Sequence, residues 1–269
     1  MPVLFPKKDN ENPTSTQGEN RENTNPIELS INGEGVIDPT DNPKTRNTKE
    51  NYIICKFNIS QNEETRIING GRNVGNLKKN LSLFVNNKAI EFIQKYRFNS
   101  IEENEVKIVC NSDFEDAGSL FTSCKNITEF DFSNFNSSKI INLENFFFQC
   151  SSLQKLDLST FKCNNLKNMC GMLGNCSTLN EIILPGNTEN VDDMSFLFMN
   201  CSSLEKIDFS NFKTKNVTKM TGMFEKCSKI KKLDLSSFNT ENVKNMSKMF
   251  NKCVTLSEIN LSSFQAAQA

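Results

Sequence analysis

The segments Cys201–Phe212 (CSSLEKIDFSNF) and Asn216–Cys227 (NVTKMTGMFEKC) show one unit of a sequence repeat. The cysteine that begins each unit recurs after 26, 26, 25, 26 and 26 residues. Counted from that cysteine, apolar residues return at offsets +3, +6, +8 and +11, and again near +16, +19, +22 and +23. Six cysteines therefore set the register of the repeat: Cys124, Cys150, Cys176, Cys201, Cys227 and Cys253.

Each unit combines two periodicities. Offsets +6 and +8 alternate as in a short strand, whereas +16, +19, +22 and +23 fit one apolar face of a helical or 3₁₀ turn. One such unit cannot bury enough apolar surface to stand alone, so neighbouring units must stack. The sequence therefore predicts an α+β fold whose main part is a right-handed leucine-rich-repeat solenoid, with short parallel strands and short helical turns.

The two segments quoted above resemble the BspA-like leucine-rich repeats, which are known from bacterial surface proteins and are also expanded in protists. The resemblance covers roughly residues 114–264. Residues 84–88 and 95–98 are similar to a β segment that often precedes such repeats in protist members. The resemblance implies a curved solenoid used for adhesion or protein–protein contact, with no catalytic residues to transfer.

Composition divides the chain into four regions. Residues 1–50 are polar and punctuated by Pro, which predicts an extended or disordered arm. Residues 51–112 alternate as strands do, and we expect a small antiparallel β domain. Within it, Asn86-Asn87 favours a hairpin, although a helix over residues 76–96 also fits the spacing. Residues 113–264 form the solenoid, with about five full units and partial end units, and residues 265–269 form a tail.

The third unit departs from the pattern. It reads Ile182-Ile183-Leu184-Pro185-Gly186, lacks both the usual Asp and the usual Phe, and is one residue short. We expect a local irregularity there. Before Cys124, an incomplete first unit is predicted from Phe114, Ala117, Leu120 and Phe121.

The composition excludes several kinds of chemistry. The chain has no His, so catalytic systems and zinc sites that need imidazole cannot form. The formal charge of −1 gives no global reason to expect nucleic acid or a membrane as partner. No apolar run is long enough to span a bilayer, and the N-terminus lacks the features of a signal peptide. An intracellular location is favoured, with the cell surface as the alternative.

The ten cysteines allow three interpretations. Reduced thiols packed in the core are favoured for the six that begin the units. Cys163 and Cys170, with Cys150 and Cys176, could form a zinc site, although their spacing matches no familiar zinc pattern. Cys55 and Cys110 lie on predicted strands and could pair in an oxidising compartment.

Two charged regions are candidate interaction sites, and no cofactor or metal is expected. Lys at offset +5 and Asp at +7 predict an exposed face on which the opposite charges neutralise one another. Residues 101–150 carry a net charge of −6 and residues 201–253 a net charge of +6, which marks a basic end. The candidate face comprises Lys155, Asp157, Lys206, Asp208, Lys232 and Asp234. The candidate basic end comprises Lys213, Lys215, Lys219, Lys226, Lys229 and Lys231.

These features predict a non-catalytic scaffold or structural subunit within a larger assembly. It would bind protein partners through the solenoid and the N-terminal arm. A partner could order residues 1–50 and cover the C-terminal end, where no capping repeat is seen. The alternative is a cell-surface adhesin that binds host or matrix proteins with the same solenoid.

Overall fold

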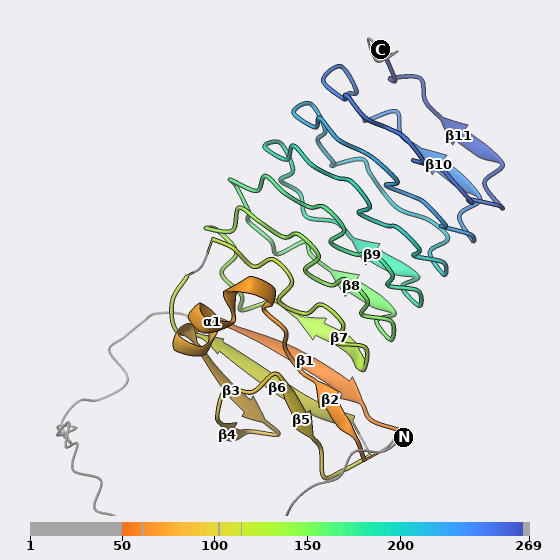
Figure 1. The fold of residues 1–269 in the computed structure, drawn as a ribbon. Helices are drawn as coiled ribbons and strands as arrows, with labels where there is room; N and C mark the ends of the chain where they lie inside the picture. The colour runs from red at the N-terminus through yellow and green to blue at the C-terminus, as the bar shows by residue number, and fades with distance from the viewer. Residues whose placement is uncertain (1–49, 61, 102, 114, 266–269) are drawn as a thin grey trace, which may run out of the picture. The chain divides into compact units, whose positions relative to one another are not determined.

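The computed structural model describes residues 50–265 except 61, 102 and 114 (Figure 1). The predicted arm, but for residue 50, and the tail, but for residue 265, lie outside the described residues. So does Phe114, which was assigned to the incomplete first unit.

The N-terminal part is built on a five-stranded antiparallel sheet with the order β4-β3-β6-β1-β7. Its inner face is apolar because alternate residues of each strand point inward, as Ile53, Cys55 and Phe57 do from β1. A pair of short strands, β2 (Glu64–Arg66) and β5 (Lys95–Arg97), lies outside this sheet. The five strands are β1 (Tyr52–Asn58), β3 (Leu81–Val85), β4 (Lys88–Ile90), β6 (Glu103–Cys110) and β7 (Ile127–Asp131).

Residues 76–96 contain the predicted hairpin, whereas the helix that also fitted this spacing is confined to a short segment that ends at Asn80. A 3₁₀ turn, η2 (Gly71–Asn73), leads into α1 (Val74–Asn80), and the chain becomes extended at Leu81. The hairpin of β3 and β4 then turns at Asn86 and Asn87, whose φ angles are 47° and 65°. Asn tolerates this left-handed conformation, which a two-residue hairpin turn requires at both positions.

The sheet joins the N-terminal part directly to the repeats. Strand β7 belongs to the unit that begins at Cys124, yet it pairs antiparallel with β1, so that Cys55 lies opposite Phe130. The loop before α1 contacts the same region, because Asn69 donates its backbone N–H to the Leu120 carbonyl at 2.7 Å. The first repeat therefore packs on the sheet through backbone hydrogen bonds as well as side chains.

The following units consist mainly of turns, with a few three-residue strands. Parallel pairing occurs between β8 (Lys155–Asp157) and β9 (Glu181–Ile183), and between β10 (Lys232–Asp234) and β11 (Glu258–Asn260). The segment of the intervening unit, residues 205–209, is not a strand.

On another side of the units, isolated parallel bridges connect the residues at offset +18 of successive units. The third unit is one residue short, so its later residues stand one offset lower than their equivalents in the other units. The bridged residues are Asp116, Asn142, Asn168, Asp193, Lys219 and Asn245.

The predicted fold class is wrong. The largest sheet is antiparallel, each parallel sheet in the described chain has only two strands, and α1, the single α-helix described, precedes the repeats. An α+β solenoid of stacked parallel strands and helical turns is therefore not what the structure contains. The apolar spacing at +16 to +23 belongs to turns instead.

The backbone explains why these turns are not helical. Residues in the left-handed region recur near offsets +21 and +25, such as Asn145 (φ 54°) and Gln149 (φ 63°). Alternate N–H groups bond to the next unit rather than within a helix: Asn145 donates to the Cys170 carbonyl at 2.9 Å, and Phe147 to that of Met172 at 2.8 Å. A helix would need those N–H groups for its own i−4 carbonyls.

The core of the repeats consists of side chains that stack on their equivalents in the next unit. At offset +23, Phe224 stacks on Phe250 and on Phe198, the equivalent residue of the short unit, with ring centroids 5.8 and 5.7 Å apart and nearly parallel planes. Aromatic contacts of this kind stabilise a fold by about 0.5–1.5 kcal/mol each beyond the burial of their area. The cysteines at the start of the units are buried too, apart from Cys253, which is half-buried.

Candidate protein-interaction face

The aspartates at offset +7 are exposed, and their carboxylates fix the turn that follows each of these exposed segments. Asp157 accepts a hydrogen bond from the backbone N–H of Ser159 at 2.8 Å, and Asp208 accepts one from Ser210 at 2.8 Å. Hydrogen bonding from Ser210 holds the pKa of Asp208 below its ordinary value. Asp234 does the same with Ser236 at 3.0 Å, and hydrogen bonding to Ser236 likewise lowers its pKa.

Two of the three lysines at offset +5 form ion pairs with glutamates at the same offset in the next unit. Lys155 Nζ lies 2.7 Å from a Glu181 carboxylate oxygen, and Lys232 Nζ lies 2.8 Å from one of Glu258. The Glu181 carboxylate raises the pKa of Lys155. Across the junction, Lys56 of β1 pairs with Glu129 of β7 at 3.0 Å.

These two rows, at offsets +5 and +7, make up what we call the charged face. It differs from the sequence prediction in how the charges are compensated. Neutralisation was expected between Lys and Asp, but the ion pairs found on this face in the described chain join Lys to Glu of the neighbouring unit. Asp157, Asp208 and Asp234 bond to backbone N–H groups instead. The six predicted residues do lie at two offsets, in the exposed segments of the second, fourth and fifth units.

The six lysines of the predicted basic end do not form a row. They occupy six different offsets, so none lies directly above another in successive units. Lys219 pairs with Asp193 at 3.2 Å, and that carboxylate raises its pKa. Lys213 uses its backbone groups to join units, whereas its side chain is exposed. The positive charge of this region is therefore distributed around the units.

The row of cysteines forms a ladder of thiol hydrogen bonds. The thiols donate to carbonyls of the preceding unit, for example Cys176 Sγ to Phe147 at 3.1 Å and Cys227 Sγ to Phe198 at 3.1 Å. Burial raises the pKa of Cys176 to about 12. Such thiols stay protonated and serve as weak donors rather than nucleophiles.

Cys163 and Cys170, the two cysteines of the repeats that lie outside the row, have separate explanations. Cys163 takes the buried position at +13 that Ser137 and Thr214 fill in other units. Cys170 lies in the turn at +20 and is half-buried. Burial is the first cause that raises the pKa of each thiol to about 11. In the described part of the chain, no group of three or more His, Cys, Asp or Glu side chains is arranged to hold a metal ion.

The two cysteines of the N-terminal sheet are free, and they lie opposite different residues of the neighbouring strands. Cys55 pairs across the sheet with Val106, whereas Cys110 pairs with Leu81. Burial raises the pKa of both thiols, and that of Cys110 reaches about 12. All ten cysteines are free thiols in the structure.

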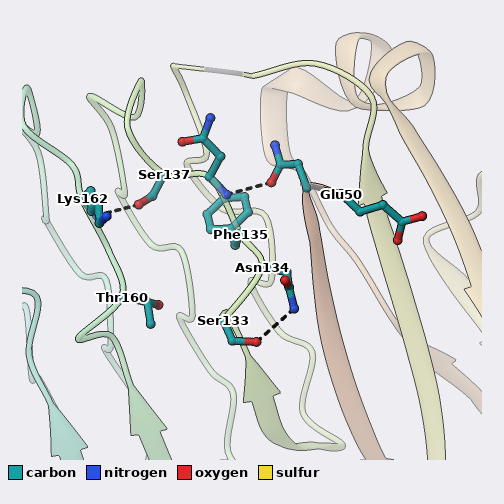
Figure 2. A pocket seen from close by; sticks show the side chains of 9 residues that line it. Glu50, Ser133, Asn134, Phe135, Ser137, Thr160 and Lys162 are labelled. Atoms are coloured by element: carbon teal, nitrogen blue, oxygen red, sulfur yellow. Dashed lines mark hydrogen bonds between the residues drawn. The ribbon is translucent and has the colours of Figure 1, made fainter. Parts of the chain in front are cut away.

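Two hollows lie near the charged face. A depression of about 610 Å³ covers β7, β8 and β9 and extends from Glu129 past Lys155 to Ile183. A pocket of about 450 Å³ lies beside the start of β1 (Figure 2).

The pocket beside β1 is lined by polar groups that bond to one another. Asn136 donates its backbone N–H to Asn51 Oδ1 at 2.8 Å, and Lys162 donates its own to Ser137 Oγ at 2.8 Å. Figure 2 shows both bonds. This pocket offers amide and hydroxyl groups, together with the side chains of Glu50 and Lys162.

Comparison with known proteins gives a family for the repeats. The family model described as "Mycoplasma protein of unknown function, DUF285" matches residues 92–185 and again residues 172–269. The chain belongs to this DUF285 family. The two matches together cover the repeats and the last strands of the N-terminal part. No curated protein and no solved structure matches the chain.

DUF285 is commonly associated with BspA-like repeat proteins, but the match does not establish that narrower label. The structure adds one observation about membranes. The described helix α1 has only seven residues. No helix in the described part of the chain is long and apolar enough to cross a bilayer.

Proposed function

We propose that this DUF285 protein is a non-catalytic binding module or scaffold subunit that recognises protein partners through the charged face. The observation that carries the proposal is the row of exposed Lys and Glu side chains at offset +5, held at regular spacing by the units beneath. Complementary charges on a partner would steer association and set its register. The BspA-like label, to which the quoted motifs point, forms part of the same proposal.

The chemistry of the thiols supports a role without catalysis. Burial raises the pKa of the half-buried Cys170 thiol to about 11, so little thiolate exists at neutral pH. Ten free cysteines also favour a reducing compartment, since disulfides form in oxidising ones. We therefore place the scaffold role within the cell, and a surface adhesin would be an outcome of the test.

The experiment is affinity capture of the full chain from native cells, with chemical cross-linking and mass spectrometry. The informative variant is the double exchange Lys155→Glu with Glu181→Lys, which keeps the ion pair and the net charge but reverses the pattern. We expect it to lose the partner. A matched control exchanges Lys95 and Glu64, an ion pair of β5 and β2 whose atoms are 4.0 Å apart.

A second arm of the experiment removes residues 1–49, because the N-terminal arm is also proposed to contact a partner. Loss of capture in that variant alone would assign binding to the arm. Capture that survives the Lys155/Glu181 exchange, with cross-links away from the charged face, would refute the proposed face. Capture of matrix or host proteins at the cell surface would replace the scaffold by the adhesin.

A further inference from the structure

Ile183 interrupts the row of acidic residues at offset +7. The equivalent positions hold Asp131, Asp157, Asp208 and Asp234, and each carboxylate accepts a backbone N–H two residues further on. An Ile side chain cannot do this. It is also 49% exposed, so it contributes little to the core of its own unit. Packing within the chain therefore does not account for an apolar residue at this place.

The surroundings of Ile183 are hollowed on both sides. The depression of about 610 Å³ over β7–β9 ends at Ile183. A smaller hollow of about 140 Å³ begins there and runs past Leu184 to Asp208 and Phe212 of the next unit. In the described chain β9 has no strand partner in the next unit, and parallel pairing resumes only at β10 and β11. An apolar side chain of a partner could thus contact Ile183 without displacing any paired strand.

Lys206 supplies a positive charge beside this apolar point. It lies in the next unit at offset +5, and its side chain is exposed. Lys155 and Lys232 have Glu partners, but none of the ion pairs found in the described chain includes Lys206. The residue at offset +5 in the following unit is Lys232. Two lysines therefore stand next to each other in a row that otherwise alternates between Lys and Glu. The unit of Lys206 is joined to the one before it by the parallel bridge of Asp193 and Lys219, so the two are separated by roughly one strand spacing, about 5 Å.

We infer that Ile183 and Lys206 together dock an extended segment of a partner protein that carries an apolar side chain next to a carboxylate. This inference rests on the proposed function and names the chemistry of the partner. A nucleic acid fits less well, because its closely spaced phosphates would also face Glu181 and Asp208, whereas a single carboxylate can pair with Lys206 alone. The exposed Ile would gain burial, and the free ammonium would gain an ion pair.

The test is selection of phage-displayed random dodecapeptides against the full-length protein. We expect enriched peptides to carry an apolar residue adjacent to Asp or Glu. Their affinity, measured by fluorescence anisotropy, should fall at least about tenfold for Ile183→Asp and for Lys206→Glu, which corresponds to about 1.4 kcal/mol. Ile183→Asp restores the residue type of the other units, so the variant should fold.

Two matched controls make the same chemical changes elsewhere. Ile101→Asp alters another exposed isoleucine, which is 67% exposed in the N-terminal part, and Lys229→Glu alters a lysine outside the row. Both should bind the selected peptides as the wild type does. No enrichment, enrichment of peptides lacking the apolar–acidic pair, or equal binding by Ile183→Asp would overturn the inference. The proposed function would survive that outcome if cellular partners still cross-link to the charged face.

Discussion

Thr188 and Lys213 bond to each other in both directions across two units. The Thr188 hydroxyl donates to the Lys213 carbonyl at 2.8 Å and accepts the Lys213 backbone N–H at 2.8 Å. Thr214 makes the same pair with Asn239, at 3.0 and 2.8 Å. One buried threonine hydroxyl thus satisfies both the backbone N–H and the backbone carbonyl of a residue in the next unit. That residue has no strand partner to do so.

Replacing Thr188 by Val should destabilise the protein by about 1–3 kcal/mol, because both Lys213 backbone groups lose their partner while the shape is kept. The free energy of unfolding by urea provides the measurement. Thr221→Val is the control, since Thr221 is only half-buried. A loss no larger than that of the control would show that water replaces the hydroxyl at no cost.

The free energy of unfolding should fall as the pH rises above about 8.5. Burial raises the pKa of Cys176 to about 12, whereas an unfolded thiol titrates near 8.5. The folded state then holds a proton that the unfolded state has lost. The stability is complete below pH 8.5 and is lost progressively toward pH 12, by up to about 1.4 kcal/mol per pH unit for each such thiol.

Urea unfolding at pH 7, 9 and 10 measures that slope. Cys176→Ala should be less stable at pH 7, because it leaves a cavity and removes a hydrogen bond. Its stability should nevertheless decline less steeply with pH than that of the wild type. Identical slopes for the two proteins would mean that the Cys176 thiol ionises equally easily in both states.

The repeat offsets allowed the buried residues to be predicted from sequence, but not the conformation of the turns. Most residues at +3, +8 and +11 are apolar because they are buried in the core of the repeats, and this leaves a clear periodic signal. The left-handed positions leave almost none, since equivalent turn positions hold Asn145, Gly171, Phe196 and Lys248 in different units. The apolar spacing therefore favoured a helix when only the sequence was considered. In the structure, the backbone N–H groups of these turns instead donate to carbonyls of the next unit.

The charged face was predictable in its residues and not in its contacts. Lys155 and Asp157 stand two residues apart, which suggests that they neutralise each other. The carboxylate of Asp157 instead bonds to the Ser159 N–H at 2.8 Å, and the ammonium of Lys155 reaches Glu181 in the next unit at 2.7 Å. The sequence signal for the Asp157–Ser159 bond was the Ser two residues after each Asp. The bond forms because an Asp side chain in an Asx turn accepts the backbone N–H two residues further on.

Gly222→Ala should destabilise the protein by about 1–2 kcal/mol or more. Gly222 has a φ of 59°, a conformation that costs any residue with a Cβ roughly that amount. An added Cβ would also lie 2.7 Å from two carbons of the Phe196 ring. Thermal unfolding followed by circular dichroism provides the measurement.

Two variants separate the strain from the clash. Lys226 has a φ of 62°, so Lys226→Gly should be neutral or stabilising by up to about 1 kcal/mol. A Cβ added at Gly186 would have no neighbouring atom within 4 Å, and this residue has no left-handed φ, so Gly186→Ala should change little. If Gly222→Ala behaves as Gly186→Ala does, the turn at residue 222 is not left-handed in solution.

Asp208 should prove replaceable by Asn but not by Ala. Its Oδ1 accepts the Ser210 N–H at 2.8 Å, and Asn260 already makes the equivalent bond with Ser262 at 3.1 Å in the last unit. Asp208→Asn keeps the acceptor, whereas Asp208→Ala leaves the turn without one and should lower the melting temperature.

The acid dependence of stability distinguishes the wild type from Asp208→Asn. Hydrogen bonding from Ser210 lowers the pKa of Asp208, so the stabilisation from its carboxylate is present above the unfolded pKa of about 3.9 and is lost as the pH falls through the lower folded value. Asn does not titrate, and the variant should therefore lose less stability between pH 5 and pH 2 than the wild type. An equal loss would mean that the Asp208 side chain contributes as a neutral acceptor, and that its charge has no part in holding the turn.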